Sequence, residues 1–316
     1  MGSRHFIGVD GGGSKTSAIV VDESMRPLGQ AVSGPSNHLR VGIDEAARNV
    51  ETAIRAAIAA SPVELDAVEY TYCGIAGSDH PMHRERVIES LRYLFPRNNF
   101  TVDSDARVAL TAGIGFDAGI VVISGTGSVA FGRNEALVEA RAGGWGPTLG
   151  DEGSGYSIAR RGLSAVVRSH DGRGPETLIT DLLCTHYGMC DPVDLPYFVY
   201  APTTHADDIA LYCRIVFEAA QQGDAVALEI VNREGSELGV MATAVARKLG
   251  MTDAPFPIAW VGGAFQAGAL LLDPMTAVLS EHVPYASLNA ARETPVMGAA
   301  RMAVRGAISA RPSRRP

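Results

Sequence analysis

Near its N-terminus the chain carries a glycine-rich turn whose residue types suit the binding of a phosphate group. The turn consists of Asp10, Gly11, Gly12, Gly13, Ser14, Lys15 and Thr16. Three successive glycines let backbone N–H groups approach an anion closely, and the two hydroxyls add donors. The Asp10 carboxylate, at the expected end of a strand, could hold a hydrated Mg²⁺ ion. The spacing fits neither a P-loop nor a Rossmann turn. A plain tight hairpin is the alternative.

A second turn of the same character lies in the middle of the chain. An apolar run ends at Ser124, and Gly125, Thr126 and Gly127 follow it. One such turn would say little, but two turns that each open the same strand pattern could hold a polyphosphate from two sides. Another buried strand ends in Gly262 and Gly263, which would allow a flat ring such as adenine to approach closely.

Two acidic residues, Asp103 and Asp105, follow a strand-like segment and precede a helical one. A carboxylate at such a junction suits a general base that removes a proton from a substrate. Either residue could instead cap the helix. Residue type and spacing leave these two interpretations equally open.

The glycine-rich stretch 143–155 cannot form a regular element, and it predicts a shaped loop that leads into a helix near residue 155. Loops of this kind on a rigid scaffold often carry ligand contacts. Trp145 could instead pack in the core, and Asp151 with Glu152 could simply place negative charge at a helix N-terminus.

The elements that would position these residues follow a pattern that occurs twice. In each half, a strand, a glycine turn and two further strands come first, and the short connections favour hairpins over crossovers. The first half has expected strands at 5–9, 17–22, 27–33, 70–75 and 99–103, with helices at 44–60, 81–95 and 106–112. The second has expected strands at 119–124, 128–133, 137–141 and 257–261, with helices at 155–161, 206–222, 226–249 and 296–307.

This repeat predicts an α/β protein with two lobes of related design. We expect the first lobe to contain residues 1–114 and the C-terminal helix 296–310, and the second to contain residues 115–295. Residues 311–316 are expected to form a tail. A ligand would then bind in the cleft between the lobes.

The composition of the chain disfavours several classes of protein. The net charge of -8 over 316 residues disfavours a general nucleic-acid binder, which would normally be basic. No apolar run is long enough for a membrane span and no signal peptide fits the start, so we expect a cytoplasmic protein. The four cysteines, Cys73, Cys184, Cys190 and Cys213, are expected to be free thiols, because Cys184 and Cys190 are too far apart for a CxxC pair.

Taken in order, these motifs resemble the two phosphate motifs and the adenosine motif of the actin–Hsp70–hexokinase superfamily of ATPases. Within it, the chain resembles the N-acetylglucosamine kinases and related amino-sugar kinases of the BadF/BadG-type ATPase family. The resemblance covers nearly the whole chain. Its most specific part is the combination of Gly-Trp-Gly at 144–146 with Gly-Asp-Glu-Gly-Ser at 150–154.

The resemblance implies a ribonuclease-H-like fold in both lobes and the use of ATP, Mg²⁺ and an amino sugar, in a homodimer. Asp105, followed by Ala106, matches the catalytic aspartate of the family, which would remove a proton from a sugar hydroxyl, expected to be O6. ATP would contact the two phosphate turns (10–16 and 125–127), Ala210, Gly262 and Gly263. The sugar would contact Asn37, Asp79, Asp105, Gly144, Trp145, Gly146 and Asp151.

One position departs from the family pattern. Ala76 stands where mammalian N-acetylglucosamine kinases have a serine, and Ser78 or Asp79 could replace that sugar contact. N-acetylglucosamine is the leading substrate, with glucosamine and N-acetylmuramic acid as alternatives. A second alternative is the ATPase activator of 2-hydroxyacyl-CoA dehydratases, but that class needs cysteine ligands for an iron–sulfur cluster. No cysteine here lies in a matching loop.

Overall fold

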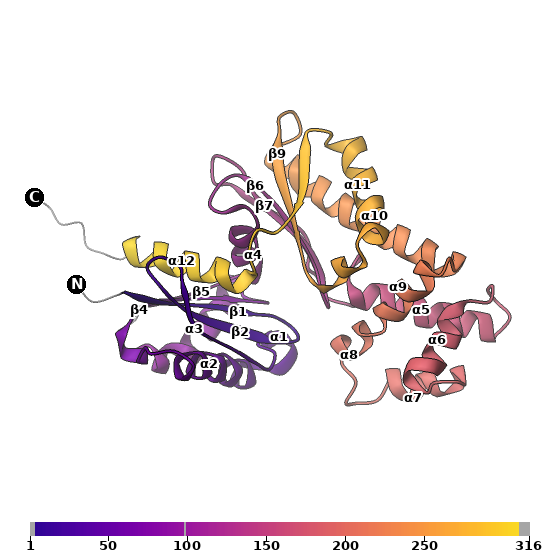
Figure 1. Ribbon diagram of the computed structural model, residues 1–316, viewed down its shortest axis with the longest axis horizontal. Helices are drawn as coiled ribbons and strands as arrows, with labels where there is room; N and C mark the ends of the chain where they lie inside the picture. The colour runs from indigo at the N-terminus through magenta and orange to yellow at the C-terminus, as the bar shows by residue number, and fades with distance from the viewer. Residues whose placement is uncertain (1–3, 98, 310–316) are drawn as a thin grey trace, which may run out of the picture. The chain divides into compact units, whose positions relative to one another are not determined.

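The computed structural model describes residues 4–97 and 99–309, and the chain divides into two compact units (Figure 1). Unit 1 comprises Met1–Phe116 and Ala291–Pro316, and unit 2 comprises Asp117–Ala290. The connection after Ala290 belongs to unit 1 because Glu293 N–H donates to the Ala112 carbonyl and its carboxylate pairs with Arg301. The tail expected at 311–316 lies outside the described residues. Within the described part of the chain, no helix is long and apolar enough to cross a membrane.

The sheet of unit 1 has five strands in the order β3-β2-β1-β4-β5. The β1–β2 and β2–β3 pairs are antiparallel, and β1, β4 and β5 are parallel. The parallel strands therefore end at the same edge of the sheet. The strands are β1 (His5–Gly11), β2 (Thr16–Asp22), β3 (Pro27–Ser33), β4 (Val68–Ile75) and β5 (Phe100–Asp103).

Helices cover both faces of this sheet (Figure 1). On one face α2 (Ile43–Ala59) and α3 (Pro81–Leu91) bury their apolar sides. On the other face α4 (Asp105–Ile114) and α12 (Pro295–Ser309) form a second cluster. The four-residue α1 (His38–Val41) precedes α2. The expected helix 81–95 ends earlier, at Leu91, and continues as a 3-10 turn, Arg92–Leu94.

The sheet of unit 2 repeats the arrangement in the order β10-β9-β6-β7-β8. Again the first three strands along the chain are antiparallel neighbours, and β6, β9 and β10 are parallel. This repetition confirms the expected α/β class with two ribonuclease-H-like sheets. The strands are β6 (Gly119–Ser124), β7 (Ser128–Arg133), β8 (Glu139–Gly143), β9 (Phe256–Val261) and β10 (Ala286–Ala290).

Most of the helical mass lies in unit 2. The expected helix 206–222 is wrong as a single element, because the chain turns at residues 211–212. The expected strand 137–141 starts later, because Leu137 has φ +61 and lies in a turn. The helices are α5 (Gly155–His170), α6 (Leu178–Tyr187), α7 (Leu195–Val199), α8 (Ala206–Ala210), α9 (Cys213–Gln221), α10 (Ala225–Leu249) and α11 (Ala269–His282).

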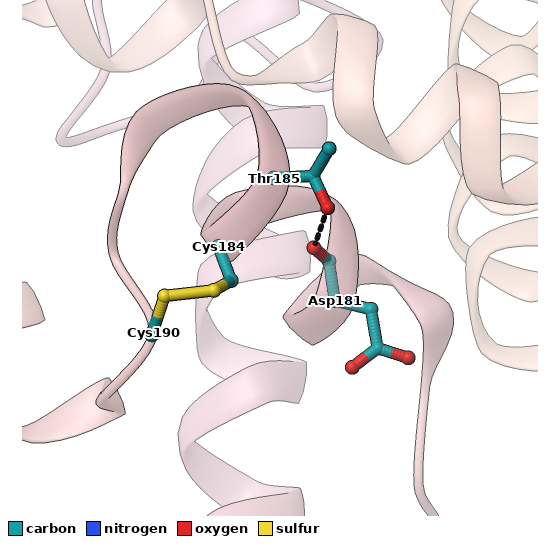
Figure 2. The surroundings of a disulfide bond; sticks show 4 residues. All are labelled: Asp181, Cys184, Thr185 and Cys190. Carbon is teal, nitrogen blue, oxygen red and sulfur yellow. Dashed lines mark hydrogen bonds between the residues drawn. A yellow bond between two sulfur atoms is a disulfide. The ribbon is translucent and has the colours of Figure 1, made fainter.

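The cysteines correct another expectation. Cys184 and Cys190 form a disulfide, so the prediction of four free thiols is wrong for this pair (Figure 2). Gly188 adopts a left-handed conformation just after α6 and turns the chain back, which brings the two Cα atoms within 4.2 Å. The CxxC criterion does not consider such a turn at a helix end. Cys73, which is buried, and Cys213, which is partly buried, are free.

Candidate functional site: carboxylates and loops at two sheet edges

The parallel strands of unit 1 place two aspartates in one row at the end of the sheet. The register pairs Asp10 of β1 with Gly74 of β4, and Gly74 with Asp103 of β5. Gly74 is required in the middle of the row, because a Cβ there would lie 2.6 Å from the Val108 side chain of α4. The close approach of α4 brings its first residue, Asp105, to the same edge.

Asp105 is the first residue of α4, and Ser104 caps the helix. The Ser104 hydroxyl accepts a hydrogen bond from the Ala106 N–H at 3.3 Å, and Asp105 Oδ1 accepts from the same N–H at 3.0 Å. Burial and the Asp79 carboxylate raise the pKa of Asp105 to about 6, although hydrogen bonds to its carboxylate from the Ala106 N–H and the Ser104 hydroxyl oppose the rise. A carboxylate with this pKa is mostly ionised at neutral pH and is a better base than an ordinary one.

Asp103, the other candidate, already has several partners. Its carboxylate accepts hydrogen bonds from the Tyr72 hydroxyl and the Ser104 N–H, both at 2.8 Å. It also pairs with Arg107 and, at 3.4 Å, with Arg84. A carboxylate surrounded by donors and two guanidinium groups stabilises the β5–α4 junction. Asp105 remains the candidate base that the family resemblance implies.

Asp10 contributes a second carboxylate close to Asp105. Burial and the charge of Asp105 together raise the pKa of Asp10 to about 7, although Lys15 opposes the shift. Among the described residues, no hydrogen bond to the Asp10 carboxylate is found. Negative charge at this edge is therefore only partly compensated by the protein.

The turn between β1 and β2 presents some of its predicted phosphate contacts and hides another. A hydrogen bond from Gly12 N–H to the Lys15 carbonyl, at 2.9 Å, closes the turn. Ser14 and Lys15 are exposed. Thr16 is buried, and its hydroxyl donates to the Gly34 carbonyl at 2.8 Å. Ser14 is therefore better placed than Thr16 to offer a hydroxyl to a ligand.

Two further segments of unit 1 meet this turn. Asn37 N–H donates to the Gly12 carbonyl at 3.1 Å, and Ala76 N–H donates to the Gly11 carbonyl at 2.8 Å. The Asn37 side-chain oxygen caps α1, which leaves its amide N–H groups for a ligand. Of the two candidates to replace a serine at position 76, Ser78 is fully buried, whereas Asp79 is exposed and acts electrostatically on Asp105.

In unit 2 the second phosphate turn and the 143–155 loop form one hydrogen-bonded assembly. The hydroxyl of Ser124 donates to the Gly153 carbonyl and that of Ser128 to the Glu152 carbonyl, both at 2.6 Å. Backbone bonds of 2.8 Å run from Gly144 N–H to the Ser128 carbonyl and from Gly155 N–H to the Gly125 carbonyl. The segment predicted to bind sugar is therefore fixed directly to the segment predicted to bind phosphate.

Asp151 and Trp145 have different roles in this loop. Asp151 is 6% exposed, has φ +64, and accepts backbone hydrogen bonds from Ser128 and Gly146, which oppose the rise in its pKa caused by burial. It thus stabilises the loop from within. Trp145 is 64% exposed, and the Arg141 guanidinium lies 5.0 Å from its ring centre. The alternative that Trp145 packs in the core is therefore wrong.

The residues predicted to lie near adenosine gather around the same turn of unit 2. Gly262 has φ +125 and packs against the backbone of Ser124, too closely for any Cβ. A Cβ on Gly155, at the start of α5, would lie 3.5 Å from the Ala210 carbonyl. Gly263 is exposed at the end of β9. Ala210 itself is buried.

One buried ion pair was not predicted from the sequence. Glu234 of α10 accepts a hydrogen bond from Gly153 N–H at 2.5 Å and pairs with Arg161 of α5. A signal was present, since Glu234 shares the apolar face of α10 with Ile230, Val231 and Leu238. A buried acid on such a face needs partners, but the sequence does not identify them.

We compared the chain with known protein families, curated proteins and solved structures. The model of the BadF/BadG/BcrA/BcrD ATPase family matches residues 7–303. The chain belongs to this family of ATPases.

Two curated relatives extend over nearly the whole chain. The chain is 33% identical to an N-acetyl-D-glucosamine kinase of Dictyostelium discoideum, over 96% of this chain and 99% of that protein. It is 30% identical to an N-acetylmuramic acid/N-acetylglucosamine kinase of Clostridium acetobutylicum, over 94% and 97%.

A solved structure from Chromobacterium violaceum, whose assignment as an N-acetylglucosamine kinase is itself provisional, superposes with a TM-score of 0.75. It is 25% identical, and the match covers 96% of this chain and 99% of that one.

Proposed function

We propose that this protein is an ATP-dependent amino-sugar kinase that phosphorylates the 6-hydroxyl of N-acetyl-D-glucosamine. The observation that carries the proposal is the placement of Asp105 at the start of α4, with a pKa raised to about 6. It lies at the sheet edge shared with Asp10, and Asp79 acts on it electrostatically. The kinase relatives and the family match support the same reaction class.

In the proposed mechanism Asp105 accepts the proton of the attacking sugar hydroxyl, whose own pKa is far above neutrality. Asn37, Asp79, Gly144, Trp145 and Gly146 orient the sugar. Asp151 shapes that loop. Ser14 and Thr126 offer hydroxyls to the phosphates, and Ala210, Gly262 and Gly263 accommodate adenosine. Phosphoryl transfer depends mainly on such positioning and on charge stabilisation.

The residues present fit a Mg²⁺ ion. Among the described residues, no cluster of three or more His, Cys, Asp or Glu side chains is placed to hold a metal. A single carboxylate suffices, however, because Mg²⁺ usually keeps several waters and binds substrate phosphates. Asp10 would hold the ion through water, since its incompletely compensated negative charge favours a cation. When bound, Mg²⁺ would neutralise part of the negative charge of the phosphates.

The charge of unit 1 bears on the choice of sugar. The carboxylate of Asp105 interacts electrostatically with those of Asp10 and Asp79. Like charges repel, so this edge favours a neutral N-acetyl sugar or cationic glucosamine over N-acetylmuramic acid, whose lactyl group is anionic. The cysteines disfavour the dehydratase activator, because Cys184 and Cys190 are joined to each other and Cys73 is buried.

An ADP-release assay tests the function directly. The purified protein is incubated with ATP and Mg²⁺ and with each of N-acetylglucosamine, glucosamine, N-acetylmuramic acid, N-acetylmannosamine and glucose. We expect the strongest stimulation with N-acetylglucosamine, and NMR of the product should place the phosphate on O6. Absence of stimulation by every sugar would refute the kinase proposal, and an iron assay on anaerobically purified protein would then test the activator.

We also propose that the enzyme works in the cytoplasm as a homodimer, as the resemblance implies. Analytical ultracentrifugation at micromolar concentration measures the oligomeric state, and a monomer there would overturn this part of the proposal.

A further inference from the structure

Glu234 is a fully buried carboxylate, 0% exposed, whose two oxygens face two donors. Oε2 accepts a hydrogen bond from the backbone N–H of Gly153 at 2.5 Å. Oε1 accepts from Nε of Arg161, whose side chain is 26% exposed. A buried charge requires this kind of pairing, because removing one partner leaves an unsatisfied group away from water.

The position of this carboxylate matters because of what Gly153 is attached to. Gly153 has φ +81, and a Cβ on it would lie 2.5 Å from the Leu238 side chain, so the loop backbone lies directly on α10. The Gly153 carbonyl accepts from Ser124, at the second phosphate turn. Two residues earlier, Asp151 holds the loop to Gly146 and Ser128. Gly153 is thus where α10 meets the loop that carries Trp145.

We propose that Glu234 is a positioning residue for sugar binding: its carboxylate, oriented by Arg161, fixes Gly153 and thereby the 144–151 loop. It touches neither sugar nor nucleotide in this role. The inference rests on the proposed kinase function, since the loop is assigned to the sugar there.

The two donors explain why a carboxylate is needed at position 234. Glutamine has the same shape but only one acceptor oxygen, so in Glu234→Gln an NH₂ group must face either the Gly153 N–H or Arg161. One contact becomes repulsive while the packing volume stays the same. The matched control is Glu229→Gln, which makes the same chemical change at an exposed position of the same helix.

Steady-state kinetics give the first test. We expect Glu234→Gln to raise the KM for the sugar roughly tenfold or more, because small displacements of binding groups weaken productive binding strongly. The KM for ATP should change by less than about twofold, because the backbone bond from Gly155 N–H to the Gly125 carbonyl of the phosphate turn remains. Glu229→Gln should match the parent. Equal changes in both KM values, or unchanged KM values with less active protein, would overturn the positioning role.

Tryptophan fluorescence gives a readout that needs no turnover. The chain has two tryptophans, so in a Trp260→Phe background Trp145 reports on the loop alone. Glu234→Gln in this background should increase quenching of Trp145 by acrylamide and weaken any spectral response to the sugar. Unchanged quenching would refute the inference. If the parent neither responds to nor phosphorylates any sugar, the kinase proposal fails, while the quenching comparison still decides whether Glu234 fixes the loop.

Discussion

The same sheet edge is equipped differently in the two units. In unit 1, Asp10 precedes the glycine turn and Asp105 begins the helix after β5, so two carboxylates lie at the end of the sheet. In unit 2, Ser124 precedes the glycine turn, and its hydroxyl donates to the loop backbone. The acid of that unit, Asp151, is turned inward and accepts backbone N–H groups. The same strand order thus carries carboxylates at the sheet edge of unit 1 and a hydrogen-bonded loop at that of unit 2. Under the proposed function, the first edge is catalytic and the second binds ligand. Variants in unit 1 should mainly change turnover and its pH dependence, and variants in unit 2 should mainly change KM values.

The largest effect is expected for Asp105→Asn. An amide cannot accept the hydroxyl proton, so turnover should fall by a factor on the order of 10²–10⁴, with the KM for the sugar changed little. Steady-state kinetics with N-acetylglucosamine measure both values. Asp103→Asn is the neighbouring control: it should lower the melting temperature and retain far more turnover, because Asp103 pairs with Arg84 and Arg107. If Asp105→Asn keeps nearly the turnover of the parent protein, Asp105 is not the general base.

The next largest effect is expected in unit 2. Thr126→Ala removes a hydroxyl from the second phosphate turn, and the KM for ATP should rise roughly tenfold, which is the scale of one hydrogen bond to a charged group. The turnover number should change less than in Asp105→Asn. Thr185→Ala, an exposed threonine of α6, controls for loss of a hydroxyl elsewhere in the unit. A large fall in turnover at saturating ATP would contradict the expectation that variants in unit 2 mainly change KM values.

A smaller effect, on pH dependence, tests the electrostatics of unit 1. Turnover should decline as pH falls through about 6, because protonated Asp105 cannot act as a base. Asp79 raises the pKa of Asp105, so Asp79→Asn should move this acid limb to lower pH. The pH profile of kcat separates this shift from any change in sugar KM. A limb that stays in place, or moves to higher pH, would contradict the coupling.

The smallest effect on catalysis is expected from the disulfide of unit 2. Cys184 and Cys190 close a short loop after α6, and neither belongs to the candidate site. The double variant Cys184→Ser/Cys190→Ser should lower the free energy of unfolding by about 2 kcal/mol and leave turnover and both KM values unchanged. Urea unfolding with and without dithiothreitol measures the difference. A changed KM for ATP would show that this loop influences nucleotide binding after all.

Much of the architecture follows from local sequence. Short apolar runs, several of them followed by glycine, predicted most strands of both sheets within a few residues. Short connections between the first three strands of each sheet predicted that these strands are antiparallel neighbours. The edge strand β10 (Ala286–Ala290) had no predicted counterpart, because its side chains are mostly exposed and give no apolar pattern. The break between α8 and α9 was also missed, because both segments carry helix-forming residues. Tyr212, which lies at this break, packs against Tyr187.

For the candidate site, the sequence by itself determined which residue types stand at the ends of strands, because glycine turns and the acids beside them are local signals. The family resemblance selected Asp105 as the candidate base, and only the tertiary structure revealed the pairing of Asp103 with Arg84 and Arg107. Only the tertiary structure joined Glu234 to Gly153 and Cys184 to Cys190. The physical reason is that a carboxylate's basicity and a loop's shape depend on the partners that folding brings near. For Glu234, that partner lies on an element far away in the chain.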